Sequence, residues 1–417
     1  MARVAVVGAG WAGLAAAVRA REAGHAVVLF EMAAQLGGRA RSVDIDGQVL
    51  DNGQHILIGA YQRTLALMRT VGADPQALLT RLPLTLLYPD GRGLRLPPGP
   101  ALPGFVRGVL ACRGWTWSDR LALLAAASGW MLRGFRCDPA LTVDALCRRL
   151  PPRVRALLID PLCVAALNTP AAEASASVLL RVLRDALFSG PGAADLLLPR
   201  QPLGTLLPAP AHAWLQAAGA AVHAGSRVRQ LQADGAGWRV DGAPFDAVVL
   251  ACSAAEAARL VEDVAPGWSA RAAALRYEPI VTVYLHCDGV RWPAPMLALQ
   301  EGADAPAQFA FDHAALGGTP GVFACVVSGA RPWIDRGLDA TGAAVLRQTA
   351  ALLPGARVLR VLAEKRATFR CTPALDRPPG QVAPRLWAAG DYTAGPYPAT
   401  LEGAVRSGEA AAASLPG

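Results

Sequence analysis

The feature that most constrains this chain is a glycine-rich turn between two predicted strands near its N-terminus. Residues 4–7 form a short apolar run, residues 14–23 have helical character, and residues 27–30 form a second apolar run. The turn after the first run reads Gly8-Ala9-Gly10-Trp11-Ala12-Gly13, and the second run ends in Glu31. This order of strand, glycine turn, helix, strand and acid is the pattern that binds dinucleotides in a doubly wound α/β sheet.

Each glycine has a separate role in that pattern. Gly8 permits the tight turn, Gly10 lets the backbone approach a pyrophosphate, and Gly13 lets the helix pack closely on the strand. The N–H groups at the helix start face the phosphates, together with the positive end of the helix dipole. Glu31 is placed to accept hydrogen bonds from ribose hydroxyls. A simple glycine-rich turn is the alternative, but the two strands and the acid favour nucleotide binding.

The composition is compatible with a large apolar interior. Of the 417 residues, 53% are hydrophobic, which suits several cores, or an apolar pocket, within two or three domains or one interleaved pair of domains. The formal net charge is +8, and Lys365 is the only lysine, so arginine carries nearly all of the positive charge. The basic residues are dispersed and match no nucleic-acid motif, so no nucleic-acid partner is predicted. A cationic surface could also favour anionic lipid.

The eight cysteines include no CxxC pair and lie among apolar residues. They are therefore predicted to be reduced and buried, rather than to bind a metal or form disulfides. No signal-peptide pattern precedes the first strand, which predicts a cytoplasmic protein. The longest apolar run, residues 121–132, is too short to span a bilayer.

Three Asp-Gly turns each predict a β-hairpin. The first hairpin covers residues 42–51, the second covers residues 84–96, and the third surrounds residues 241–242. Residues 98–190 have a helical pattern, with proline breaks near residues 151 and 170. A weakly alternating strand is predicted over residues 280–285.

The two ends of the chain are predicted to form one domain. The N-terminal unit needs further strands to complete a parallel sheet, and the apolar runs 247–250 and 386–388 are the obvious donors. A helix over residues 401–412 follows them. The predicted fold is therefore α/β, with a Rossmann-like nucleotide-binding domain that is discontinuous in sequence and an inserted substrate domain of mixed helices and β-sheet. The nucleotide domain is assigned residues 1–70, 200–260 and 360–417, and the substrate or membrane-facing domain residues 71–199 and 261–359.

Two further segments suit a polar or phosphate-bearing ligand. Gly37 and Gly38 bring a loop backbone close to a ligand, and the side-chain forks of Arg39 and Arg41 suit phosphate oxygens, with a plain surface loop as the alternative. Near the C-terminus, a predicted strand ends at Gly390-Asp391, where Asp391 could hold a ribityl hydroxyl. A helix then begins at Ala399, Thr400 and Leu401. Its first N–H groups could face a polar ring edge. An ordinary strand-loop-helix is the alternative there.

Together these segments resemble the superfamily of FAD-dependent amine oxidases and phytoene desaturases, along the whole chain. The resemblance rests on residues 8–13, Glu31, Gly37-Gly38-Arg39 and the closing segment, residues 390–408. Two inner segments, residues 51–61 and residues 364–369 with Thr372-Pro373, resemble those of the squalene-associated branch, the hydroxysqualene dehydroxylases. The loop over residues 391–398 departs from that branch where flavin and substrate should meet.

The resemblance implies a resident FAD and the reductive removal of an allylic hydroxyl, which converts hydroxysqualene to squalene and water in hopanoid biosynthesis. A carotenoid-type desaturase or an amine oxidase that uses oxidised FAD is the alternative enzyme. A third hypothesis is a prenyl-lipid carrier that keeps the fold without catalysis. The implied partners are a C30 isoprenoid alcohol and an electron donor for the flavin.

Two residues are candidates for the proton donor of that reaction. His55 lies in a segment that is expected to pass the flavin ring, or else it is a structural histidine bonded to a loop carbonyl. Lys365 resembles the superfamily lysine that holds a water against the flavin, or else it forms a structural ion pair with Glu364 or another acid.

The resemblance also implies further cofactor contacts, at Gly53, Gln54, His55 and Val228. Val228 resembles the superfamily valine whose backbone meets adenine, and an ordinary strand valine is the alternative. Asn168-Thr169 could line the pocket or simply close a helix-end turn.

Residues 101–136 interleave large apolar side chains with arginines. Interfacial tryptophan with arginine suits a monotopic contact with a membrane. A helix pair packed over the substrate tunnel is the alternative, and both could hold together. The expected location is therefore cytoplasmic and peripheral, on the inner face of the cytoplasmic membrane.

Overall fold

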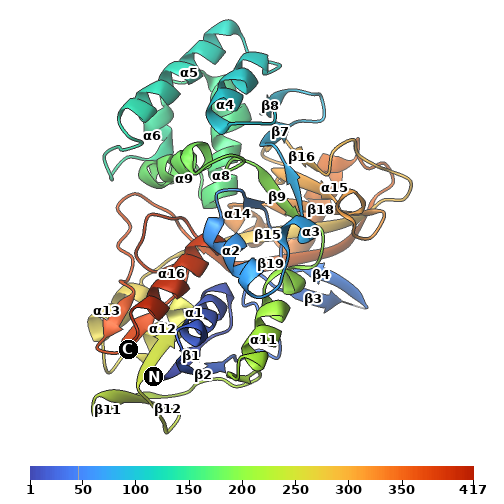
Figure 1. Ribbon diagram of the computed structural model, residues 1–417. Helices are drawn as coiled ribbons and strands as arrows, with labels where there is room; N and C mark the ends of the chain where they lie inside the picture. Colours follow the sequence, from blue (N-terminus) through green and yellow to red (C-terminus); the bar gives the residue numbers. More distant parts are fainter. Residues whose placement is uncertain (46) are drawn as a thin grey trace.

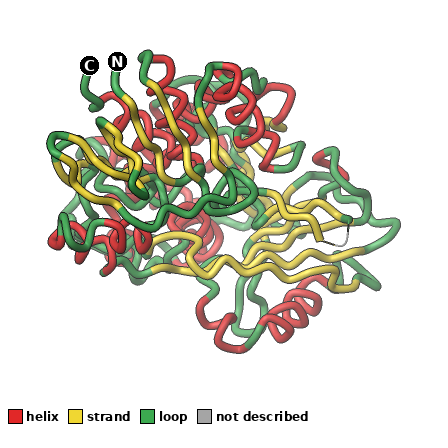
Figure 2. Tube along the Cα trace, turned by 90° about the horizontal axis from the view of Figure 1, so that it is seen from below, coloured by secondary structure: helices red, strands yellow, loops and turns green. Residues whose placement is uncertain are grey.

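The structure is a computed structural model that describes residues 1–45 and 47–417. Asp46, in the turn of the first predicted hairpin, lies outside the described residues. The chain forms two halves, and each half is built on its own β-sheet (Figures 1 and 2). Both chain ends lie in the same half, as predicted for a discontinuous domain (Figure 1).

The first half contains a six-stranded sheet in the order β10-β2-β1-β14-β21-β20. The strands from β10 to β21 are parallel, and β20 adds an antiparallel edge. Their bounds are β1 Arg3–Val7, β2 Ala26–Phe30, β10 Ala221–His223, β14 Ala247–Leu250, β20 Gln381–Ala383 and β21 Leu386–Ala388. Both predicted donor strands, 247–250 and 386–388, are confirmed as β14 and β21. They are continuously apolar because both faces of a parallel sheet are covered.

Helices α1 (Trp11–Glu22), α11 (Pro208–Ala217) and α16 (Leu401–Ala413) pack together on this sheet. Helices α1 and α16 cross very closely, because a β-carbon on Gly408 of α16 would lie 2.1 Å from the Ala12 carbonyl oxygen. The last helix of the chain is thereby fixed against the first.

The second half contains a five-stranded antiparallel sheet in the order β16-β17-β18-β15-β19. Its strands are β15 Tyr277–His286, β16 Met296–Ala298, β17 Phe309–Asp312, β18 Val322–Val327 and β19 Arg357–Phe369. Helices α14 (Arg331–Arg336) and α15 (Leu338–Thr349) cover part of it.

The pairing of β19 corrects the predicted domain boundary at residue 360. Tyr277 of β15 pairs with Phe369 of β19, so residues 360–369 belong to the substrate half rather than to the nucleotide half. The boundary at residue 261 also moves, because α13 (Pro266–Ala273) packs on α12 (Ala254–Leu260) of the nucleotide half.

A helical block joins the substrate half at the end of the molecule farthest from the chain ends (Figure 1). It comprises α4 Ala101–Ala111, α5 Trp117–Leu132, α6 Val143–Cys147, α7 Pro152–Val154, a π-helical turn Arg155–Ile159, α8 Asp160–Leu167 and α9 Ala176–Phe188. The predicted breaks are confirmed, since α7 begins at Pro152 and the chain leaves α8 through Asn168, whose φ of 48° is left-handed.

The three predicted hairpins are confirmed by antiparallel pairing on both sides of each turn. Their strands are β3 Ser42–Ile45 with β4 Gln48–Asp51, β7 Thr85–Leu87 with β8 Gly93–Arg95, and β12 Gly237–Val240 with β13 Ala243–Phe245, extended by β11 Leu231–Asp234. The remaining elements are β5 Leu57–Ile58, β6 Leu79–Leu82, β9 Leu196–Pro199, α2 Gln62–Thr70, α3 Pro75–Leu78, α10 Leu203–Leu206 and a 3₁₀ turn Ala314–Leu316.

All eight cysteines are free in the structure; six of them are buried, and Cys137 and Cys252 are partly exposed. Across residues 1–45 and 47–417, no group of His, Cys, Asp or Glu side chains is arranged to hold a metal ion. No helix in that part of the chain is long and apolar enough to cross a membrane.

Candidate functional site

One large cavity connects the two halves of the molecule. Its volume is about 850 Å³, and it extends from the glycine turn after β1 to the helical block. Every predicted cofactor residue except Gly13 lines it: Gly8, Gly10, Trp11, Ala12, Glu31, Gly38, Arg39, Arg41, Gly53, Gln54, His55, Val228, Gly390, Asp391, Ala399, Thr400 and Leu401. Segments from both ends of the chain therefore meet around one space.

The glycines of the turn divide into two kinds. Gly8 has a φ of 106°, and a β-carbon there would lie 2.7 Å from the carbonyl carbon of Ala251. A β-carbon on Gly13 would lie 1.8 Å from the Gly8 carbonyl oxygen. Gly10 differs, because among the described residues its β-carbon would meet only the Gly38 Cα, at 3.8 Å. Gly8 and Gly13 are thus required by packing, whereas at Gly10 a side chain would fill the cavity and not the protein interior.

Glu31 follows β2 directly and borders the same part of the cavity as the glycine turn, which we call the cradle. Its Oε2 accepts from the Ala9 N–H at 2.7 Å, and its Oε1 accepts from the Ala33 N–H at 2.8 Å. The carboxylate is buried and lines the cavity, and each oxygen retains room for a second donor such as a ribose hydroxyl.

Val228 lies beside this end of the cavity and is buried. It lies outside any strand, between β10 and β11. The alternative of an ordinary strand valine is therefore wrong, while the contact of its backbone with adenine stays a prediction.

Arg39 joins the two ends of the chain. Its Nη2 lies 2.6 Å from Asp391 Oδ1, and its Nη1 donates to the Ala367 carbonyl at 2.6 Å. Arg41 lines the same cavity and donates to the Gly38 carbonyl at 2.6 Å. Asp391 is buried. Its ion pair with Arg39 fixes the loop after β21 against the loop after β2.

The N-terminus of α16 opens onto the middle of the cavity. Thr400 caps it, because the Thr400 hydroxyl accepts from the Gly403 N–H at 3.1 Å. Glu402, the acid in the first turn of α16, already has two hydrogen-bond partners. It accepts from the Thr64 N–H at 2.9 Å and from Arg406 at 2.8 Å. The remaining N–H groups of this turn can face the polar edge of a ring.

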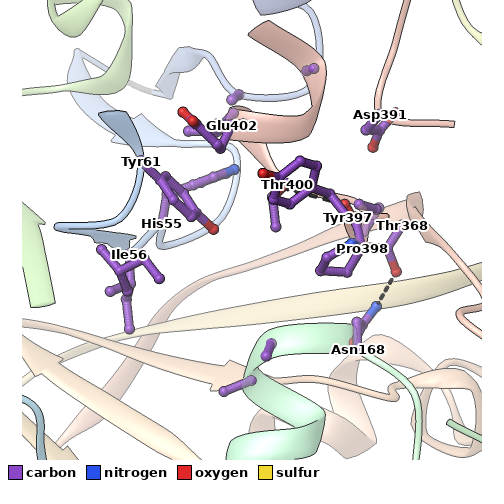
Figure 3. Close-up of a pocket in the computed structure, with 18 of the residues that line it drawn as sticks. His55, Ile56, Tyr61, Asn168, Thr368, Asp391, Tyr397, Pro398, Thr400 and Glu402 are labelled. Atoms are coloured by element: carbon purple, nitrogen blue, oxygen red, sulfur yellow. Dashed lines mark hydrogen bonds between the residues drawn. The ribbon is translucent and has the colours of Figure 1, made fainter. Parts of the chain in front are cut away.

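His55 lies in the central part of the cavity, near Tyr61 and Thr400 (Figure 3). Its Nδ1 is 2.8 Å from the Gly53 carbonyl oxygen, so the predicted bond to a loop carbonyl is confirmed. A carbonyl only accepts, and therefore Nδ1 carries the hydrogen. Burial, together with nearby Arg39, lowers the pKa of His55, so the neutral ring is favoured and Nε2 is an acceptor. Its neighbour Gln54 bonds through Oε1 to His313 Nε2, 3.2 Å away.

The hypothesis that Lys365 acts on the flavin is not supported. Lys365 is exposed and does not line the cavity, whereas its neighbours Glu364 and Arg366 do. Side chains alternate between the two faces of a strand, so β19 directs residues 364 and 366 to the cavity and residue 365 away from it. Glu364 Oε2 accepts from Asn52 Nδ2 at 3.1 Å, which keeps this carboxylate at the cavity wall.

Asn168 combines both roles that were considered for it. It caps α8 and lines the cavity, and its side-chain amide donates to Thr368 Oγ1 at 2.9 Å (Figure 3). Its Oδ1 accepts from the Gly329 N–H at 2.7 Å. The amide is thus fully used in joining α8 to the substrate sheet, while its neighbour Thr169 is buried behind it.

Two polar groups at the cavity were missed by the sequence analysis. The hydroxyls of Thr282 on β15 and Tyr392 after β21 are buried, line the cavity, and have no hydrogen-bond partner among the described residues. Thr282 Oγ1 and His55 Cε1 both lie within 4 Å of the point where a β-carbon on Gly53 would be. Neither residue belongs to a motif, so only the packing of distant strands reveals them.

The far end of the cavity is apolar. Its walls come from α5, the π-helical turn, α8, α9 and the substrate sheet, at Leu123, Leu124, Trp130, Leu158, Leu162, Leu179, Leu183, Phe309, Phe311 and Val326. The glycine turn after β1, the N-terminus of α16 and this hydrocarbon-lined space thus border one cavity. This arrangement fits an extended dinucleotide such as FAD at one end and an apolar substrate at the other.

Comparison with known proteins agrees with this geometry. The family model for flavin-containing amine oxidoreductases matches residues 11–415. A hydroxysqualene dehydroxylase of Rhodopseudomonas palustris is 30% identical, and one of Sinorhizobium fredii is 28% identical, each over 98% of this chain and 97% of its own length. A probable zeta-carotene desaturase of Synechococcus elongatus is 27% identical over 99% of this chain and 98% of its own. Among solved structures, an oxidoreductase of Methanosarcina mazei superposes with a TM-score of 0.75 at 17% identity, over 98% of this chain and 99% of that chain.

Proposed function

This chain belongs to the family of flavin-containing amine oxidoreductases, and we propose that it uses FAD to remove the hydroxyl group of hydroxysqualene reductively, giving squalene on the route to hopanoids. The observation that carries the proposal is the continuity of the cavity. A cradle for FAD and a space lined by aliphatic and aromatic side chains form one volume of about 850 Å³. Its size lies near the upper end of the range for small-molecule sites.

The chemistry needs one hydride and one proton for each molecule of substrate. When bound, reduced FAD supplies the hydride. The allylic C–O bond breaks, the hydroxyl leaves as water after it takes up the proton, and a C–H bond forms at the carbon. The allylic cation left by the hydroxyl is delocalised, and the apolar walls exclude the water that would otherwise recapture it.

We assign the proton to His55. The Gly53 carbonyl holds Nδ1–H, so a proton taken up at Nε2 is directed away from that loop. Burial lowers the pKa of His55, which makes its protonated form a stronger acid toward the departing hydroxyl. After transfer the ring returns to the neutral state that burial favours. Thr282 Oγ1 lies within the same region and has no hydrogen-bond partner among the described residues, so we assign it the role of holding the substrate oxygen beside the imidazole.

The test is anaerobic incubation of the holoenzyme with reduced FAD and hydroxysqualene, followed by product analysis. Squalene is the expected product. The variant His55→Gln is expected to keep its FAD and lose at least tenfold in turnover, whereas Lys365→Ala is expected to retain turnover. Full turnover by His55→Gln would remove the imidazole from the mechanism.

The 27% identical zeta-carotene desaturase supports a second candidate, in which oxidised FAD removes hydrogen from a polyene. The same cavity would accept such a substrate. Production of a more unsaturated polyene, with no squalene formed from hydroxysqualene, would favour this candidate. An amine oxidase is less well supported, because the substrate end of the cavity is dominated by hydrocarbon. A protein that takes up no FAD would instead be a carrier.

A location on the inner face of the cytoplasmic membrane is part of the same proposal. The substrate and the product are lipids, and the described residues include no membrane-spanning helix. The electron donor that reduces FAD must then reach the protein from the cytoplasmic side.

A further inference from the structure

Large apolar side chains are exposed together on one end of the molecule. Leu132 is 85% exposed, Trp117 65% and Leu121 61%, and all three lie on α5. Leu110 of α4 and Phe188 at the end of α9 are also exposed, at 39% and 48%. We call these five side chains the apolar end face. They belong to the helical block that lies farthest from the chain ends (Figure 1).

The cavity reaches the surface at this face. Val106 of α4 and Met131 of α5 line the cavity, yet they are 38% and 39% exposed. Ser128 of α5 also lines the cavity and is exposed. These exposed lining side chains place one opening of the cavity along α4 and α5, beside the apolar end face.

The charge of residues 101–136, which carry four of these five side chains, is almost entirely positive. Residues 101–136 contain five arginines and a single acid. That acid, Asp119, is buried in a capping box with Thr116 at the start of α5. Arg120 stacks over the ring of Trp117 at 4.8 Å, while Arg107 and Arg133 are exposed on α4 and directly after α5.

These features favour an anionic lipid bilayer as the partner of the apolar end face. A second copy of this chain would bring its own arginines against the first set, and like charges brought together oppose association. An anionic bilayer supplies negative charge for the arginines and hydrocarbon for the apolar side chains. Helix α5 has 16 residues, and no described helix can cross a membrane, so the helices would lie in the interface.

We propose that the apolar end face docks on an anionic lipid bilayer and that a lipid substrate passes from the bilayer into the cavity between α4 and α5. The identity of that lipid rests on the proposed function, but the docking does not. Transfer inside an apolar passage avoids exposing a C30 chain to water. It places the FAD cradle at the end of the molecule remote from the membrane, where a reductant in water can reach it.

The first test is flotation of the holoenzyme with vesicles. Wild-type protein is expected to float with vesicles of phosphatidylcholine and phosphatidylglycerol, at least tenfold more than with phosphatidylcholine alone, and to lose this preference at high salt. The double variant Leu121→Glu/Leu132→Glu is expected to bind the anionic vesicles at least tenfold less. Leu338→Glu is the matched control, because Leu338 is 38% exposed on α15 outside the face.

The second test separates docking from catalysis. Both changed leucines lie outside the cavity wall, so the double variant is expected to reduce a short, water-soluble allylic alcohol at the wild-type rate. It is expected to reduce hydroxysqualene in anionic vesicles at least tenfold more slowly. If no alcohol is reduced by any variant, the proposed function fails, while the flotation result still decides the docking.

Three outcomes would overturn the proposal. The first is wild-type protein that does not float with anionic vesicles. The second is equal flotation of the double variant and the Leu338→Glu control. The third is a wild-type dimer in sedimentation that the double variant abolishes, which would make the face an interface between two copies of this chain.

Discussion

Gly10→Ala is expected to weaken FAD binding strongly while leaving the fold of the FAD-free protein intact. Gly10 has a φ of −70°, which alanine adopts freely. Its β-carbon would meet only the Gly38 Cα, at 3.8 Å, among the described residues. The added methyl group therefore occupies cavity space between the start of α1 and the expected position of the FAD pyrophosphate.

Gly13→Ala is expected to do the opposite. A β-carbon there would lie 1.8 Å from the Gly8 carbonyl oxygen, so α1 must move by more than an ångström away from the turn. Overpacking of this kind costs about 1–3 kcal/mol. The better helix propensity of alanine offsets at most about 1 kcal/mol of this cost. The FAD-free protein should therefore unfold at lower denaturant in this variant.

The magnitude for Gly10→Ala follows from the phosphate contacts. Loss of one or two hydrogen bonds to a charged phosphate costs about 3 kcal/mol, which is roughly a hundredfold in affinity. At free FAD of about one hundred times the wild-type Kd, binding stabilises the wild type by about 2.7 kcal/mol. At the same concentration the variant would gain only about 0.4 kcal/mol.

Urea unfolding with and without FAD, together with equilibrium dialysis, measures both effects. The FAD-free form of Gly10→Ala should unfold within about 0.5 kcal/mol of the wild type, and FAD should no longer shift its midpoint appreciably. Wild-type affinity for FAD in Gly10→Ala would refute the assignment of this turn as the cradle. A wild-type urea midpoint for Gly13→Ala without FAD would refute the packing argument.

Three further predictions concern single side chains. Thr282→Val should raise the free energy of unfolding by about 1 kcal/mol, because it removes a buried hydroxyl with no partner among the described residues. Urea unfolding without ligand measures this change, and a loss of stability would contradict the prediction. Lys365→Ala should leave turnover within about twofold, since exposed side chains away from a site contribute little; a tenfold loss in the anaerobic assay would restore Lys365 to the mechanism. Burial lowers the pKa of His313 to about 4, so as pH falls below about 6.5 the unfolded chain binds a proton that the folded protein excludes. The wild type should therefore lose about 2 kcal/mol more than His313→Gln between pH 7 and pH 5, and parallel pH profiles in urea unfolding would contradict this.

The sequence by itself determined the features that depend on neighbouring residues. Gly8 needs a positive φ, and an Asp-Gly pair favours a tight hairpin, because backbone sterics act over a few residues. The continuous apolar run of β14 predicted a strand buried on both faces, and the structure places it inside the parallel sheet. The fold class followed from these local patterns in their order along the chain.

The candidate site was predictable only in part. Its cofactor end consists of loops and helix starts, whose ligand-facing groups are backbone N–H groups fixed by local sequence. Its substrate end consists of ordinary leucines and phenylalanines, such as Leu123 and Phe311, which look the same in a solid core and around a cavity. Nothing in their local sequence separates the two.

Tertiary structure alone decided which face of each element meets the cavity. Residues 364 and 365 must point to opposite faces of β19, but only the pairing of β19 with β15 shows that Glu364 faces inward and Lys365 faces solvent. The same pairing moved the domain boundary. The Arg39–Asp391 ion pair and the exposed apolar end of α5 likewise depend on segments far apart in the chain. Local sequence fixes backbone conformation and side-chain alternation, whereas the side that becomes buried is set by the distant partner that packs against it.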